Sequence, residues 1–189
     1  MEENYLNLHS RLLNLIESDP ILFSIIKTVG ELPLNDCWVA AGIIRNKVWD
    51  MLHSKQTAIN DIDVIYFDAY DLSIQTEKAL EKRLNELMPN LPWSVKNQAR
   101  MHRKNNVPPY LNSYDGVAHF PETPTSIAVR FYNNELEIMA PYGLNDLFEG
   151  RVKPSPPYKK GTNLYAIYLE RMQNKEWNTV WSKLRIEFE

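Results

Sequence analysis

The stretch Val39-Ala40-Ala41-Gly42-Ile43-Ile44-Arg45-Asn46 joins a short apolar run to the expected start of a helix. The run CWVA at 37–40 has the length and composition of a buried strand. Glycine at position 42 lets the backbone approach a ligand closely, and the following helix N-terminus offers unpaired N–H groups and a partial positive charge. The turn therefore predicts a binding site for a phosphate group, although turns of this kind also occur in proteins that bind no ligand there.

A second feature is the pair Asp61 and Asp63 at the start of a β-rich run, DIDVIYF at 61–67. In a strand, residues two apart point to the same face, so the two carboxylates are expected to lie close together. Two like charges at short distance are unfavourable unless a cation or protons neutralise them. Carboxylate oxygens suit Mg²⁺ or Mn²⁺, so the pair predicts a metal site. The alternative is that one aspartate caps a turn and the other is solvated.

A third acidic position comes from a predicted hairpin, with strands over 126–132 and 135–140 joined by Asn133-Asn134. Alternation turns Glu137 away from the core-facing side of its strand. If this strand lies beside 61–67, Glu137 completes a three-carboxylate cluster. Such a cluster can hold two metal ions about 4 Å apart, one activating an attacking oxygen and one neutralising phosphates. The alternative is a solvated hairpin face.

The remaining chain predicts an α+β domain with a mixed sheet of about five strands flanked by helices. Apolar periodicity and capping residues predict helices over 3–17, 21–30, 43–53, 71–88, 144–148 and 164–175. Alternation over 93–102 predicts a further half-buried strand, and 103–125 and 151–163 are expected to be loops. We expect a single domain over 1–189, with an N-terminal helical pair at about 3–30 and a C-terminal helical tail at about 164–189.

Composition excludes several classes of protein. The 189 residues are 44% hydrophobic with a formal charge of −3, which is typical of a globular chain and not of a basic nucleic-acid binder. The single cysteine, Cys37, excludes an internal disulfide and a cysteine-based zinc site, and we expect it to be a small buried hydrophobe. No apolar run approaches the roughly 20 residues that span a bilayer, and no secretory signal is visible, so a cytoplasmic protein is expected.

The charges are divided unevenly along the chain. Residues 1–93 carry 8 basic and 14 acidic side chains, whereas residues 94–189 carry 13 basic and 10 acidic ones. This division is compatible with an anion held between metal-binding carboxylates and basic groups, and equally with a chance distribution of solvated charges.

Together these features resemble the nucleotidyltransferase superfamily of polymerase β, the CCA-adding enzymes and the aminoglycoside nucleotidyltransferases. The strand, glycine turn, helix and Asp-x-Asp strand follow in the superfamily's order, and Ile-Ile-Arg after the glycine is most similar to CCA-adding sequences. A closer resemblance, over about residues 20–185, is to a bacterial family of predicted nucleotidyltransferases of about this length. It runs through AGIIRNKVWDMLH (41–53), NDIDVIYFD (60–68), WSVKNQARMH (93–102), FPETPTSIAVRF (120–131), EIMAPYGLNDLF (137–148) and a terminal pattern from Arg171 to Trp181.

The resemblance implies a polymerase β-like fold, with Gly42 at the nucleotide phosphates and Asp61 and Asp63 as metal ligands. Many relatives carry their third acid on the strand soon after the Asp-x-Asp pair. That stretch, 93–102, has no acid here, so Glu137 is the candidate for the third metal ligand and catalytic carboxylate. Many relatives also have Gly-Gly or Gly-Ser where this chain has Ala41-Gly42.

Two arginines are expected to bind the nucleotide. Arg45 lies one turn into the helix, where it either reaches a phosphate or pairs with Asp50 or a neighbouring residue. Arg100 is expected on the same strand face as His102, while Asn97 is either a buried structural amide or the mark of a bulge.

The resemblance implies an enzyme that moves a nucleoside monophosphate from an NTP to an unknown acceptor, releasing pyrophosphate, with Mg²⁺ or Mn²⁺ as cofactor. The alternative is a catalytically inactive nucleotide-binding or interaction module of the same fold. We expect neither a membrane nor a nucleic-acid partner.

Overall fold

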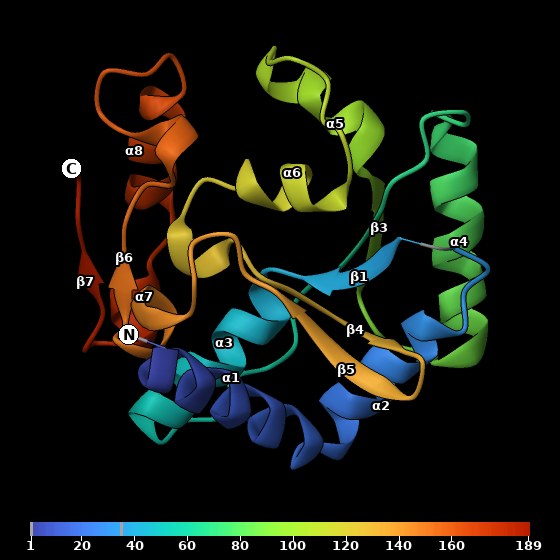
Figure 1. The fold of residues 1–189 in the computed structure, drawn as a ribbon, viewed down its shortest axis with the longest axis horizontal. Coiled ribbons are helices and arrows are strands. Elements are labelled where there is room, and N and C mark those ends of the chain that lie inside the picture. Colours follow the sequence, from blue (N-terminus) through green and yellow to red (C-terminus); the bar gives the residue numbers. More distant parts are fainter. Residues whose placement is uncertain (1, 35) are drawn as a thin grey trace.

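The computed structural model describes residues 2–34 and 36–189, with side chains from Asn7 onward. Its centre is a five-stranded mixed sheet in the order β3-β2-β1-β4-β5 (Figure 1). Strands β2 and β3 run parallel, and the other neighbours are antiparallel. The strands are β1 (Cys37–Ala40), β2 (Ile62–Tyr66), β3 (Trp93–Asn97), β4 (Ala128–Tyr132) and β5 (Glu135–Met139). The α+β prediction with about five strands is confirmed.

Helices lie on both sides of this sheet. In Figure 1, the helices α1, α2 and α3 lie below the sheet, α5, α6 and α8 lie above it, and α4 stands beside β3. Their bounds are α1 (Glu2–Glu17), α2 (Pro20–Gly30), α3 (Gly42–His53), α4 (Ile74–Leu87), α5 (Gln98–Asn105), α6 (Ser113–Ala118), α7 (Asn145–Phe148), α8 (Tyr165–Asn174) and α9 (Trp177–Val180). Two 3₁₀ turns, η1 (Thr123–Thr125) and η2 (Pro156–Tyr158), complete the connections.

The two faces of the sheet are unequal. The lower face, which includes Val39, Val64 and Val129, joins the helices in a large apolar core whose members run from Leu8 to Leu184. The upper face carries a smaller cluster that includes Trp38 and Ile65. Because the upper face is only partly filled by apolar groups, it is the face on which a polar site can lie open to solvent. The single-domain division stays a prediction.

The predicted strand over 93–102 is wrong in its second half. The side chain of Asn97 accepts a hydrogen bond from the Ala99 N–H at 3.0 Å, which is the geometry of a helix N-cap, and α5 begins at the next residue. The alternation of polar and apolar residues in QARMH is therefore incidental. The expected loop over 103–125 also contains α6, which begins with the side chain of Asn112 accepting from Asp115 N–H at 2.8 Å.

The sequence predicts a helical C-terminal tail over about 164–189. In the structure this segment is only partly helical. After α8 and α9 it ends in β7 (Arg185–Ile186), which pairs in parallel with β6 (Arg151–Val152). Trp177 and Trp181 pack edge-on against Trp49 of α3, each at 5.3 Å between ring centroids. The C-terminal segment is thus packed against α3, the helix that begins at Gly42.

Within the described residues, no helix is long and apolar enough to cross a membrane.

Candidate active site

The turn before α3 adopts a conformation that L-residues rarely take. Ala41 has φ 55° and ψ −116°, and its N–H is bonded to the Ile127 carbonyl at 2.8 Å. No side chain caps the N-terminus of α3, so its first N–H groups remain available to a ligand. A Cβ added to Gly42 would have no neighbour closer than Arg45 Nη2 at 3.8 Å. Packing within the protein therefore does not require glycine at this position.

One of the two aspartates, Asp63, lies beside this turn, whereas Asp61 precedes β2 and lines a separate pocket. Strand register sets Asp63 directly opposite Ala40, and Ala41 and Asp63 line the same cleft. Burial first, and then the neighbouring charge of Asp61, raise the pKa of Asp63 to about 6, against the opposing effect of Arg45, Lys96 and Arg171. A partly buried carboxylate beside a second carboxylate is a donor set that favours a divalent cation, so the residues fit the metal that the resemblance implies.

A cleft of about 280 Å³ opens above Asp63 on the upper face of the sheet. Its walls come from α5, the segment around α6, η2 and α8, which are distant in sequence (Figure 1). Three basic side chains line it, Lys96, Lys104 and Arg171. The cleft thus combines the carboxylate of Asp63 with cations on its walls, which is the charge arrangement that holds a phosphate group close to a metal site.

One wall is fixed by a buried ion pair. The side chain of Glu122 is fully buried, and both of its oxygens accept from Arg171, Oε1 from Nε at 2.7 Å and Oε2 from Nη2 at 3.3 Å. This pair joins α8 to the loop that precedes η1. In the sequence, Glu122 stands out only as part of the stretch FPETPTSIAVRF (120–131) that carries the family resemblance.

Glu137 is not brought to the aspartate pair. The expectation that its strand lies beside 61–67 is wrong, because β1 and β4 stand between β2 and β5. Three strand spacings separate the backbones by about 14 Å. Glu137 instead pairs with Arg130 of the neighbouring strand, Oε2 lying 2.6 Å from Nη2, and Arg130 stacks on Trp38 at 4.3 Å. Among the described residues, no group of three acidic, histidine or cysteine side chains is placed to hold a metal.

Arg45 is buried behind the turn. Its Nη1 donates to Thr125 Oγ1 at 2.8 Å and its Nη2 to Asn46 Oδ1 at 2.8 Å. The guanidinium also stacks on Trp49 and Trp177, at 4.8 and 4.4 Å from the ring centroids, and burial lowers its pKa to about 10. Of the two protein partners that the sequence offers as alternatives, Asp50 and a neighbouring residue, Arg45 bonds the neighbour Asn46. These contacts tie α3 to η1 and to the C-terminal segment, and they leave its nucleotide-binding role a prediction.

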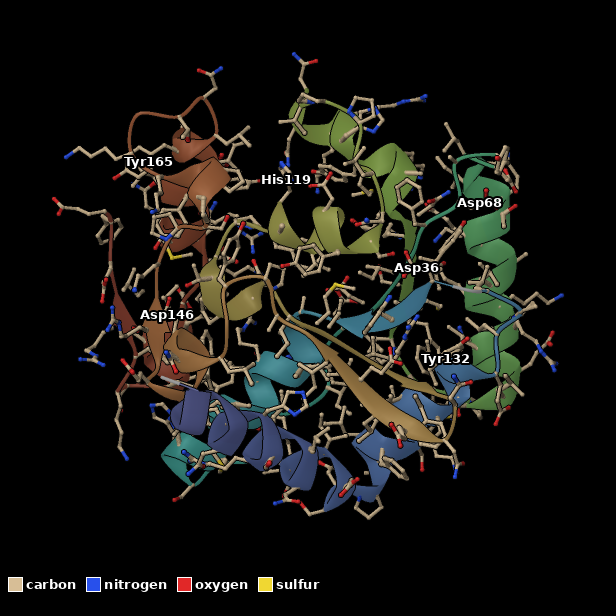
Figure 2. All side chains as sticks on the ribbon, viewed as in Figure 1. Asp36, Asp68, His119, Tyr132, Asp146 and Tyr165 are labelled. Carbon is tan, nitrogen blue, oxygen red and sulfur yellow. The ribbon has the colours of Figure 1, made fainter. Side chains whose placement is uncertain are left out.

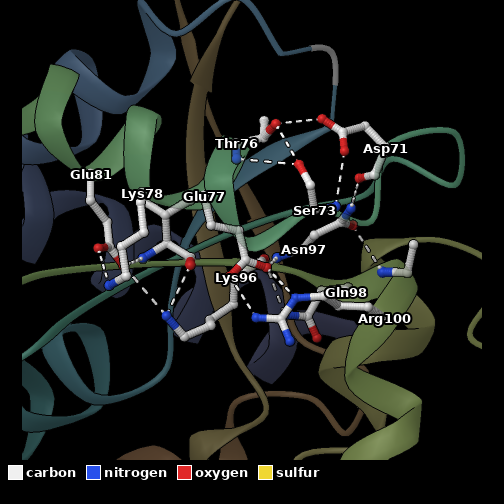
Figure 3. Close-up of polar contacts among 12 residues, drawn as sticks. Asp71, Ser73, Thr76, Glu77, Lys78, Glu81, Lys96, Asn97, Gln98 and Arg100 are labelled. Carbon is white, nitrogen blue, oxygen red and sulfur yellow. Dashed lines mark hydrogen bonds and ion pairs between the residues drawn. The ribbon is translucent and has the colours of Figure 1, made fainter.

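Arg100 lies on α5 and not on a strand, so it does not share a strand face with His102. Its Nε and Nη2 donate to the two oxygens of Glu77 at 2.6 and 2.5 Å (Figure 3). It borders a shallow groove beside the cleft together with Lys96 and Lys104. Asn97 is the buried structural amide that the sequence had offered as one alternative, since its side chain also holds the backbone of Asp68.

Sequence reasoning missed several residues of the cleft, notably Lys104, His119 and Tyr158. No local pattern distinguishes them, because they converge only through the packing of α5, α6 and η2 above the sheet. Arg171 had a signal, as part of the terminal pattern shared with the resembling family, but no role could be given to it before Glu122 was seen beside it.

Comparisons with known proteins agree with this geometry. A family model described as nucleotidyltransferase matches residues 27–186. A structure described as the NMR structure of a protein that reveals a CCA-adding enzyme head domain is 32% identical. The match covers 95% of this chain and 96% of that one, with a TM-score of 0.85.

More distant structures share the fold. The Thermotoga maritima CCA-adding enzyme complexed with tRNA is 15% identical, with a TM-score of 0.56 over 94% of this chain and 42% of that one. A tRNA-processing enzyme is 13% identical, with a TM-score of 0.53 over 86% of this chain and 44% of that one. The chain thus matches less than half of each of these two enzymes, and no curated protein matches it in sequence. On the family match and the close structural relative, the chain belongs to the nucleotidyltransferase family and has the polymerase β-like fold of a CCA-adding enzyme head domain.

Proposed function

We propose that the protein transfers a nucleoside monophosphate from an NTP to an acceptor hydroxyl and releases pyrophosphate. One observation carries this function: Ala41, which directly precedes the uncapped N-terminus of α3, and Asp63 line the same cleft, which is walled by cations. Family membership supports the reaction class, and the acceptor is to be identified by experiment.

In this proposal the free N–H groups at Gly42 and the next residues bind phosphate oxygens, which helix N-termini favour through their partial positive charge. Lys96, Lys104 and Arg171 line the cleft where they can neutralise the remaining phosphate charge. Neither role requires a side chain to move across the sheet.

Asp61 and Asp63 would hold the Mg²⁺ or Mn²⁺. When bound, the metal supplies charge neutralisation for the phosphates and lowers the barrier to attack by the acceptor oxygen. Mg²⁺ commonly takes one or two carboxylates from a protein and completes its shell with phosphate oxygens and water. Two aspartates are therefore a sufficient protein contribution, and the proposal does not use Glu137.

The experiment is to incubate the protein with each of the four NTPs, radiolabelled at the α-phosphate, together with Mg²⁺ and cell extract. We expect label to appear on an acceptor with the wild type and not with a variant carrying Asp61→Asn and Asp63→Asn. Glu135→Gln, an exposed change on the edge strand β5, is the matched control and should label as the wild type does.

The result also separates the two functions considered from the sequence. Titration calorimetry of the same NTPs with Mg²⁺ measures binding without turnover. Binding that the aspartate changes abolish, with no acceptor ever labelled, would favour the inactive nucleotide-binding module. Absence of binding by the wild type would contradict both.

A further inference from the structure

We propose that His119 is the general base that removes the proton from the acceptor hydroxyl, which rests on the proposed transfer reaction. His119 lies at the C-terminal end of α6 and lines the same cleft as Asp63 (Figure 2). Its side chain is 27% exposed, so it is reachable from the cleft yet held by the protein. No metal or nucleotide role has been given to it.

The hydrogen bonds of the ring fix which nitrogen carries the proton. Nδ1 lies 2.8 Å from the Asp115 carbonyl oxygen and 3.3 Å from the Asp115 carboxylate oxygen Oδ1. Both are acceptors, so Nδ1 must be the donor and Nε2 of the neutral ring carries the lone pair. Within residues 2–34 and 36–189, Nε2 has no hydrogen-bond partner, which leaves it available to accept a proton from a ligand.

The orientation of the ring is fixed as well. The Tyr110 ring lies against it, with 4.7 Å between centroids and 32° between planes. Asp115 is itself fixed, because its Oδ2 accepts from the Leu111 N–H at 3.0 Å. A base held by a second group in this way is the arrangement found around activated hydroxyl nucleophiles.

Other cleft groups do not offer a base at neutral pH. Lys96, Lys104 and Arg171 are cations, and burial raises the pKa of both Tyr110 and Tyr158, the latter to about 12. These tyrosines therefore stay protonated and cannot accept a second proton.

The acids near the cleft are already engaged. Glu122 is bound by Arg171, Glu137 pairs with Arg130 outside the cleft, and the proposed function assigns the aspartate pair to the metal. Among the described residues that line the cleft, His119 is the side chain that offers an imidazole nitrogen without a hydrogen-bond partner.

The proton and electron balance is simple. The hydroxyl proton moves to His119 Nε2 as the acceptor oxygen forms a bond to the α-phosphorus. The bond from that phosphorus to the bridging oxygen breaks, and pyrophosphate leaves with its electron pair. The imidazolium then returns its proton to solvent, so the reaction consumes one NTP and one hydroxyl and needs no other reactant.

The first test measures turnover of radiolabelled NTP with the acceptor labelled in extract, or with water as acceptor, forming NMP and pyrophosphate. We expect His119→Gln to lower kcat about 100-fold, within the range for loss of a general base, with the NTP dissociation constant changed less than twofold. Added imidazole should restore part of the turnover of His119→Ala. His102→Gln, a histidine of α5 that does not line the cleft, is the matched control.

The outcomes are distinguishable. Full turnover by His119→Gln beside an active wild type would overturn the base and leave the transfer reaction standing, and equal loss of binding and turnover would indicate a structural role. A wild type that binds NTP but forms no product would contradict the transfer reaction, and with it the base. A second test is independent of turnover: ¹⁵N–¹H spectra of the histidine rings should find His119 protonated at Nδ1, and protonation at Nε2 in the neutral ring would refute the proposal.

Discussion

Replacing Arg171 by methionine removes the cation from a carboxylate that water does not reach. Glu122 is fully buried and both of its oxygens are bonded to Arg171. Breaking a buried pair from one side costs about 3–5 kcal/mol, because the remaining charge is left uncompensated. Arg45 also attracts Glu122 and partly replaces the lost charge, so we expect the lower end, about 3 kcal/mol. For a chain of this length, that corresponds to a fall in Tm of roughly 6–12 °C.

Urea unfolding at 25 °C measures the loss in unfolding free energy. The m-value from the same curve shows whether the substitution also changes the unfolded state. The double variant Glu122→Leu, Arg171→Met removes both charges, and we expect it to recover at least half of the loss. Arg185→Met is the control, since Arg185 is an exposed cation 3.9 Å from Glu149 and should cost less than about 1 kcal/mol. A cost below about 1 kcal/mol for Arg171→Met, or a double variant as unstable as the sum of the singles, would refute the argument.

Three further predictions concern the turn, the aspartates and the C-terminal segment. Gly42→Ala should leave Tm unchanged or raise it slightly, because the new Cβ meets no close neighbour, and it should weaken NTP binding in calorimetry at least tenfold. Gly30→Ala is the control, because its new Cβ lies 2.7 Å from the Phe131 carbonyl oxygen and should lower Tm without that loss of binding. The pKa of Asp63, raised from 3.8 to about 6, makes its ionised form costly, so the stability linked to its protonation is complete below about pH 3.8 and is lost as pH rises through 6. A shift of about two pKa units corresponds to about 3 kcal/mol, so Asp63→Asn should raise Tm by up to roughly 6–12 °C at pH 8 without Mg²⁺, and equal values for wild type and variant would contradict this. Trp181→Phe deletes the 2.8 Å hydrogen bond to Asp50 Oδ1 and should cost about 1.5–3 kcal/mol in urea unfolding, while an unchanged midpoint would argue against it.

Local signals in the sequence were enough to predict the glycine turn, the Asp-x-Asp strand and the hairpin, because each is encoded by neighbouring residues. The strand predicted over 93–102 failed because Asn97 stops it by capping a helix, and a side-chain cap is indistinguishable from an alternating residue in the sequence.

Glu137 shows a different limit. Its orientation on the strand follows from alternation, and it does lie on the face of the sheet that carries Asp63. Its distance from Asp63 depends on strand order, which no local pattern specifies. The same holds for His119, whose place in the cleft depends on how α6 packs above the sheet. The metal-binding, nucleotide-binding and catalytic roles remain predictions in each case.

The ion pair between Glu122 and Arg171 also has a consequence for the order in which parts of the protein can fold during synthesis. During synthesis the chain emerges from its N-terminus, so the phosphate turn and the aspartates are available long before Arg171 of α8 exists. Until then Glu122 has no cation from α8 and stays hydrated, and Trp49 still lacks Trp177 and Trp181. The nascent protein therefore presents its carboxylates to solvent while one wall of the cleft is missing. The cleft can close on this side only after α8 has been made.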